Sequence, residues 1–168
     1  LSCDEAIHCE WPHEIMGPTG NGMWNQWWAY DNVRNVNELI EKLGTSVLFT
    51  ETRKTELLAE ARAIRAWYYF GMVKRYGGVP IIETPQVYDP DNLEALLVSR
   101  NTEEETYNFI LKDLNYAIEN LPKERVASEK YRMNRFSAAA LKTRAMLFAA
   151  SIAKYGTYDK NGVVGFDN

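Results

Sequence analysis

The stretch from residue 60 to residue 82 constrains the fold of this chain more than any other. It reads E-A-R-A-I-R-A-W-Y-Y-F-G-M-V-K-R-Y-G-G-V-P-I-I, beginning with small residues, turning aromatic, and ending in a glycine pair and a Val-Pro step. Trp67, Phe70 and Val73 widen its apolar surface, so we expect a helix that is packed on more than one side. The main row at helical spacing consists of Leu57, Ala61, Ile64, Tyr68, Met72 and Arg75.

This helix has a defined end in the sequence. Gly77 is well placed as its C-terminal cap, since glycine adopts the left-handed backbone conformation at little steric cost. Pro80 then forces Val79 into an extended conformation, so the helix cannot resume. The pattern therefore predicts a central, buried helix over residues 53–76 that leaves as an extended segment.

Two further helices follow from similar patterns. The first covers residues 24–43 and stops at Gly44. The second covers residues 102–121 and opens with the capping box Thr102–Glu105, in which a hydroxyl and a carboxylate each satisfy a free backbone amide. Pro122 ends it. The inward stripe of the first of these helices consists of Ala29, Val33, Val36, Ile40 and Leu43.

A fourth helix is expected over residues 135–155, which are rich in alanine. Small side chains let helix axes approach closely, and we expect Ala61 and Ala140 to mark such crossings. The four helices form two pairs, so the sequence predicts an all-α fold of stacked helix hairpins with long irregular loops. No 34-residue self-similarity accompanies the pairs, so the pattern alone does not specify a tetratricopeptide repeat.

The length and composition of the chain favour one domain. Its 168 residues, 46% of them hydrophobic, are enough to bury one core. We expect a single helical domain over 1–168. Its parts are an irregular region (1–22), a first helix pair (23–76), a long connection (77–100), a second helix pair (101–155) and a turn with a truncated tail (156–168).

The string over residues 60–82 also closely resembles the signature helix of the SusD/RagB family. These are surface-exposed outer-membrane lipoproteins that capture nutrients, chiefly glycans. Further landmarks of the family are matched in the family's order. They are Asp4-Glu5-Ala6, Tyr30-Asp31-Asn32-Val33, Arg100-Asn101-Thr102-Glu103-Glu104, Asp113-Leu114, Leu121-Pro122 and Asn134-Arg135-Phe136-Ser137-Ala138-Ala139-Ala140.

The resemblance implies both a fold and a function. SusD-like proteins are built around tetratricopeptide-like helix pairs, and they are not enzymes. This chain would bind an oligosaccharide or polysaccharide at the cell surface and deliver it to a SusC-type TonB-dependent outer-membrane transporter. The resemblance also implies a fragment, without its secretion signal, its lipidated N-terminal cysteine and a long C-terminal part. The alternative is a helical-repeat scaffold that binds another protein and has no sugar site.

Composition and motifs argue against several other functions. A net charge of −4 does not fit the concentrated basic face that nucleic acids require. The sequence has neither a phosphate-binding glycine loop nor a hydrolase nucleophile motif. The acidic run Glu103–Glu105 fits a helix N-terminus, where negative charge meets the helix dipole favourably, and Asp89 and Asp91 fit a solvated loop. We therefore expect no catalytic residue and no cofactor.

A metal site is not expected either. Cys3, His8, Cys9 and His13 lie close together in the sequence, but they lack the paired Cys and His spacings of structural zinc sites. Cys3 and Cys9 leave two alternatives open, namely a small disulfide in an oxidising compartment and two free thiols.

Aromatic residues supply the remaining candidate site. The flat C–H faces of sugars pack on aromatic rings, and amide or guanidinium groups satisfy their hydroxyls. The segment 21–28 contains both aromatic rings and amide groups. Trp28 lies beside the inward stripe and is assigned mostly to packing, and the aromatic run Trp67–Phe70 to the buried helix. We predict glycan contacts from Trp11, Trp24, Asn25 and Trp27.

The charged loop Lys123-Glu124-Arg125 has no aromatic or amide cluster. Together with the resemblance, this composition predicts that the loop and the exposed faces of the helix pairs contact the transporter rather than the ligand.

Overall fold

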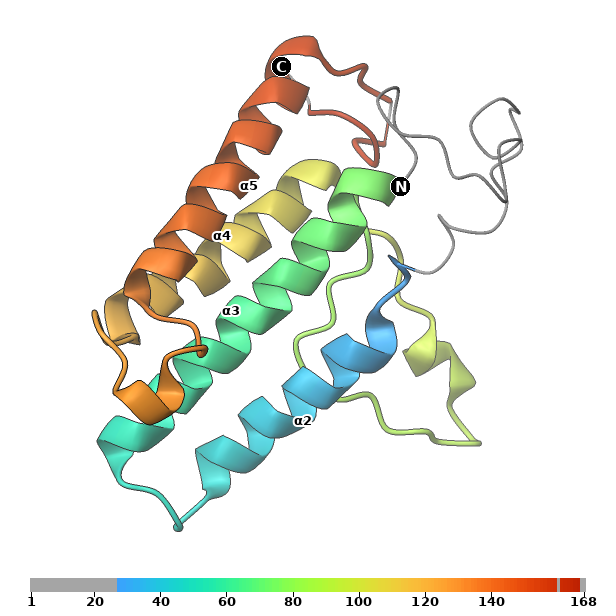
Figure 1. Cartoon of the computed structure of the whole chain (residues 1–168). Coiled ribbons are helices and arrows are strands. Elements are labelled where there is room, and N and C mark those ends of the chain that lie inside the picture. Colours follow the sequence, from blue (N-terminus) through green and yellow to red (C-terminus); the bar gives the residue numbers. More distant parts are fainter. Residues whose placement is uncertain (1–26, 160, 167–168) are drawn as a thin grey trace, which may run out of the picture.

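The computed structural model describes residues 27–159 and 161–166, and Figure 1 shows its long helices lying side by side in chain order. The long helices are α2 (Tyr30–Thr45), α3 (Glu51–Tyr76), α4 (Glu103–Asn120) and α5 (Arg135–Tyr155). Two short 3₁₀ turns, η2 (Leu93–Leu96) and η3 (Ala127–Glu129), lie in the connections. The described residues contain no β-strand. The predicted all-α fold of helix hairpins is therefore confirmed.

The central position of α3 is also confirmed. It packs against α2 on one side and α4 on the other, while α5 packs mainly on α4. Tyr69 and Met72 of α3 are fully buried, as are Ile110 and Leu114 of α4. A helix with neighbours on two sides buries more than one face, which explains why apolar residues of α3 exceed a single row.

Most of the predicted helix ends are present. Gly77 ends α3 with a φ of 72°, in the left-handed region. Thr102 and Glu105 form the predicted capping box at the start of α4. A second capping box, between Asn134 and Ser137, begins α5. These local signals fix where three of the four long helices begin or end.

The first helix differs from its prediction at both ends. It begins at Tyr30, and its N-cap residue Ala29 makes no side-chain capping bond. It also runs to Thr45, so Gly44 lies inside the helix rather than ending it. The predicted start at residue 24 lies outside the described residues.

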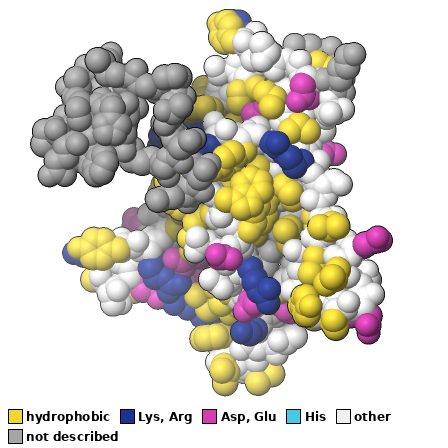
Figure 2. Space-filling view, turned by 90° about the vertical axis from the view of Figure 1, so that its right-hand side faces the viewer, with side chains coloured by type: hydrophobic (Ala, Val, Ile, Leu, Met, Phe, Trp, Pro, Cys, Tyr) yellow, Lys and Arg dark blue, Asp and Glu magenta, His cyan; other side chains and the backbone are white. Residues whose placement is uncertain are grey.

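Two predictions of burial are wrong. Ala140 of α5 is exposed, and the small residues that α5 presents to the core are instead Ala138, Ala145 and Ala149. Trp67 of α3, expected in the core, is 45% exposed. Ala61, by contrast, is buried as expected. Figure 2 shows exposed hydrophobic side chains in patches among charged ones on one face of the molecule.

No helix in the described part of the chain is long and apolar enough to cross a membrane. Within that same part, no group of three or more His, Cys, Asp or Glu side chains could hold a metal ion. Cys3, His8, Cys9 and His13 lie outside it.

Candidate functional site

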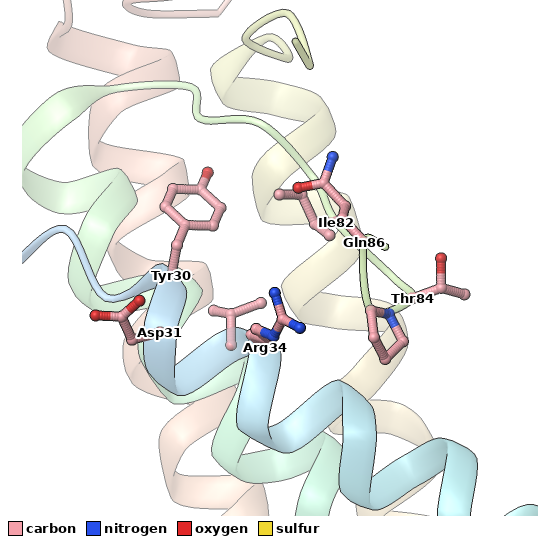
Figure 3. Close-up of a pocket in the computed structure, with 8 residues that line it drawn as sticks. Tyr30, Asp31, Arg34, Ile82, Thr84 and Gln86 are labelled. Carbon is pink, nitrogen blue, oxygen red and sulfur yellow. The ribbon is translucent and has the colours of Figure 1, made fainter. Parts of the chain in front are cut away.

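A pocket of about 150 Å³ opens between the first turns of α2 and the extended segment that follows α3. Figure 3 shows side chains of α2 on one side of it and side chains of the segment on the other. We call it the Tyr30 pocket. Its lining combines an aromatic ring, a carboxylate, a guanidinium group, a hydroxyl and an amide, which are groups that can recognise a polar ligand. The lining residues are Tyr30, Asp31, Val33, Arg34, Ile82, Thr84, Pro85 and Gln86.

Backbone chemistry directs the segment toward α2. Gly78 lies so close to the start of α4 that a Cβ there would be 2.1 Å from the carbonyl oxygen of Asn101. This contact excludes any side chain at position 78. The segment then continues through Pro80 without regular secondary structure, and proline at this position prevents the helix from resuming. Residues 82–86 therefore return to α2 and form one wall of the pocket.

Side chains from two helices hold this wall in place. The Tyr30 hydroxyl donates to the carbonyl oxygen of Pro80 at 2.6 Å. The Asn37 amide donates to the carbonyl oxygen of Ile82 at 2.8 Å. The backbone N–H of Ile82 donates to the Tyr69 hydroxyl, also at 2.8 Å. These bonds satisfy backbone groups that an extended segment outside a sheet would otherwise leave unpaired.

Both tyrosines stay protonated at physiological pH. Burial raises the pKa of Tyr30 well above its ordinary value of 10.0. Burial also raises the pKa of Tyr69, to about 12, although the hydrogen bond to Ile82 acts in the opposite direction. Both hydroxyls therefore stay neutral, so Tyr30 can donate to Pro80 and Tyr69 can accept from Ile82.

A buried ion pair lies behind the wall. Arg65 of α3 donates to both carboxylate oxygens of Asp113 of α4, at 2.7 and 2.9 Å. It also donates to Asn37 Oδ1 at 2.8 Å and to the carbonyl oxygen of Glu83 at 3.3 Å. Arg65, Asp113 and Asn37 are each at most 3% exposed. The network joins three helices to the segment that lines the pocket.

An aromatic cluster adjoins the pocket through Tyr30. The Trp28 ring meets Tyr30 and Tyr76 edge to face, with centroids 5.1 Å apart in both cases. Trp28 is nevertheless 49% exposed, so its expected assignment mostly to packing is correct for only part of the ring. An exposed ring beside a polar pocket offers an apolar surface for the C–H face of a sugar.

Of the predicted site residues, only Trp27 lies in the described part of the chain; Trp11, Trp24 and Asn25 lie outside it. Trp27 is partly buried against α3. Its ring lies 3.5 Å from the position that a Cβ of Gly71 would occupy. The Arg75 guanidinium carbon is 4.1 Å from its centroid, and the Trp67 ring is 6.1 Å away.

Sequence reasoning missed the polar lining of the pocket. In the sequence, Tyr30 and Asp31 stand out only as a family landmark, and Gln86 only as part of a long connection. The one available signal is the stretch after Pro80, which contains polar residues. A segment that leaves a helix without forming a strand must lie on the surface of a neighbouring element, so its polar residues could have been predicted to line a site there. Which surface it covers depends on bonds such as that of Tyr30, which spans 50 residues. Local patterns do not contain this information.

Comparisons with known proteins assign the chain to a family. The sequence model of the SusD-like family, described as starch-binding and associating with the outer membrane, matches residues 9–147. The chain belongs to the SusD-like family. A SusD-like protein of Bacteroides ovatus is 32% identical over 142 residues, which are 83% of this chain and 24% of that protein.

Solved structures of SusD-like proteins share the helical fold. A SusD-like protein of Bacteroides fragilis superposes with a TM-score of 0.70 and 35% identity, over 86% of this chain and 29% of that one. A laminarin-binding SusD-like protein gives a TM-score of 0.65 and 28% identity, over 88% of this chain and 32% of that one. The chain thus spans about a quarter to a third of the length of these SusD-like relatives.

Proposed function

We propose that this chain is part of a non-enzymatic glycan-binding protein on the bacterial cell surface. The observation that carries the proposal is the Tyr30 pocket beside the half-exposed Trp28 ring. An oligosaccharide would place a C–H face on Trp28 and direct its hydroxyls to Asp31, Arg34 and Gln86. Such a division between an aromatic platform and a few polar groups is common in ligand pockets.

The family supports the same reading. Its description names starch binding and the outer membrane, and one similar SusD-like protein of known structure binds laminarin. We propose an oligosaccharide or polysaccharide ligand for this chain as well. We also propose that the whole protein is anchored at the outer membrane through a lipidated cysteine.

The test is binding to a panel of polysaccharides by affinity electrophoresis and calorimetry. Trp28→Ala should weaken binding by about 1–3 kcal/mol if apolar area dominates the contact, which is up to about a hundredfold in affinity. Arg34→Ala should weaken it as well, since hydrogen bonds to charged groups contribute about 1.5–3 kcal/mol. Tyr131→Ala is the matched control, because this ring is 91% exposed and does not line the pocket.

Circular dichroism and a denaturation curve on each variant separate lost binding from lost folding. The proposal fails if the folded wild-type chain binds no polysaccharide of the panel, or if Trp28→Ala and Arg34→Ala bind as tightly as Tyr131→Ala. Retention of a protein partner together with failure to bind sugars would favour a helical-repeat scaffold instead.

We also keep Trp11, Trp24, Asn25 and Trp27 as proposed glycan contacts. Trp24→Ala is expected to weaken binding and leave the helical content unchanged. Trp27→Ala is expected to lower stability as well, because its ring packs on Gly71 and Arg75. If neither variant alters retention on any polysaccharide, Trp24 and Trp27 are not part of the site.

For the transporter, we propose that the loop after α4 contributes to contact with a SusC-type TonB-dependent barrel. Lys123 and Glu124 are exposed. The Arg125 side chain is only 4% exposed and donates to the carbonyl oxygen of Met133 at 2.6 Å, so it does not belong to this contact surface. Reversing the charges of Lys123 and Glu124 should reduce co-purification with the barrel and leave glycan affinity unchanged. Unchanged co-purification together with weaker glycan binding would overturn the assignment of this loop to transporter contact.

A further inference from the structure

We propose that Arg65 is a positioning residue for the Tyr30 pocket, and that it acts through Asn37. The proposal rests on the proposed function, since it assigns Arg65 a role in binding at that site. Arg65 does not line the pocket. Its role is to fix the backbone from Ile82 to Glu83, which sets the position of the pocket wall.

The geometry forms a continuous chain of bonds from α4 to the wall. Asp113 holds the guanidinium plane of Arg65 by two parallel hydrogen bonds, a pairing that fixes orientation as well as distance. The same guanidinium group donates to Asn37 Oδ1 and to the carbonyl oxygen of Glu83.

Asn37 relays this orientation. An amide side chain has one acceptor end and one donor end. Because Arg65 can only donate, it holds the Oδ1 end of Asn37 toward itself, and Nδ2 must then point away. Nδ2 meets the carbonyl oxygen of Ile82 at 2.8 Å. The wall is therefore bonded at two successive carbonyl groups, those of Ile82 and Glu83, and both bonds depend on the orientation of Arg65.

A buried ion pair is poorly explained by stability alone. Removing two charges from water costs free energy, and an apolar replacement of similar volume is often as stable or more stable. What an apolar replacement cannot do is bond to the backbone of the wall. The pair therefore fits a role in holding a defined pocket shape, as the residues supporting a binding site do elsewhere.

The double variant Arg65→Met, Asp113→Leu removes the pair and leaves no unpaired charge. We expect it to fold, to exchange amide hydrogens faster in residues 79–86, and to lose about tenfold in affinity for the polysaccharide that the wild-type chain binds, because the wall loses hydrogen bonds to its carbonyl groups. Asn37→Leu is the second variant, because it breaks only the relay and keeps the ion pair. Asn37→Leu should show the same faster exchange and the same loss of affinity. If the double variant does not fold, Asn37→Leu alone tests the proposal.

Arg125→Met is the control, since it removes another buried arginine that bonds to a backbone carbonyl and does not line the pocket. It should change stability and leave both exchange in 79–86 and affinity unchanged. The proposal is overturned if folded Asn37→Leu exchanges and binds like the wild type. If no polysaccharide binds the wild type, the proposed function fails, and the exchange experiment alone still decides whether Arg65 positions the wall.

Discussion

Two alanines show that an alanine in a helix does not by itself mark a close contact between helices. Ala61 is 2% exposed in the packed surface of α3, whereas Ala140 is exposed on α5. Ala61→Leu is expected to lower the free energy of unfolding by about 1–3 kcal/mol through overpacking. Ala140→Leu should change it by no more than about 0.5 kcal/mol, as is usual for surface positions.

Urea denaturation of the two variants beside the wild-type chain measures both effects. Equal midpoints for Ala61→Leu and the wild type would mean that the α3 surface tolerates the added volume. In that case α3 and its neighbours would be packed less closely than the structure indicates.

Two glycines differ in the space around them. A Cβ on Gly78 would lie 2.1 Å from Asn101 O and within 2.7 Å of two further backbone atoms, whereas a Cβ on Gly44 would meet nothing within 4 Å. Gly78→Ala should therefore destabilise the chain by about 1–3 kcal/mol or more. Gly44→Ala should stabilise it by up to about 1 kcal/mol, because Gly44 lies inside α2. Thermal melts of both variants test whether Gly78→Ala lowers the melting temperature and Gly44→Ala raises it.

At the scale of helices, the N-terminus of α4 contains a buried carboxylate. Glu103 is 4% exposed and accepts the backbone N–H of Gly165 at 2.6 Å. Burial raises the pKa of Glu103 above its ordinary value of 4.5, and nearby Asp159 acts in the same direction. The folded state therefore holds this proton more tightly than the unfolded state. The stabilisation is present below pH 4.5 and is lost as the pH rises through the folded pKa.

Glu103→Gln keeps an acceptor oxygen for Gly165 and removes the titration. The free energy of unfolding of this variant, minus that of the wild type, should increase as the pH is raised from 4.5 toward 7. Glu104→Gln, at the exposed neighbouring position, is the matched control for the loss of a carboxylate. Denaturation curves at several pH values measure the difference, and a flat profile for Glu103→Gln would contradict the assignment.

The helices also show which features are determined locally and which are not. The ends at Gly77 and Thr102 depend on residues within a few positions, and both predictions are confirmed. The pairing of Arg65 with Asp113 spans 48 residues, and no periodicity reveals it. The wrong prediction for Trp67 has the same cause. Its apolar side chain indicates burial, but its exposure depends on which side of α3 has a neighbouring helix, and local patterns do not show this.

At the scale of the whole molecule, α5 has two different faces. Ala138, Ala145 and Ala149 are buried, whereas Phe136, Leu147 and Tyr155 are at least 62% exposed. Leu147→Glu is therefore expected to change the free energy of unfolding by no more than about 0.5 kcal/mol. Ala145→Glu, which buries a charge without a partner, should prevent stable folding. Circular dichroism on both variants tests this, and a large loss for Leu147→Glu would show that its side chain contributes to the core.

The order of the helices in space has a consequence for how the chain folds. Neighbours in the sequence are also neighbours in the structure, since α2 packs on α3, α3 on α4 and α4 on α5. The α2–α3 and α4–α5 interfaces close the shorter connections 46–50 and 121–134. The most extensive interface, between α3 and α4, must close the longer connection from Tyr76 to Glu103. Closing a longer connection costs more conformational entropy than closing a shorter one. We therefore expect the two hairpins to form early and their docking through α3 and α4 to limit the folding rate.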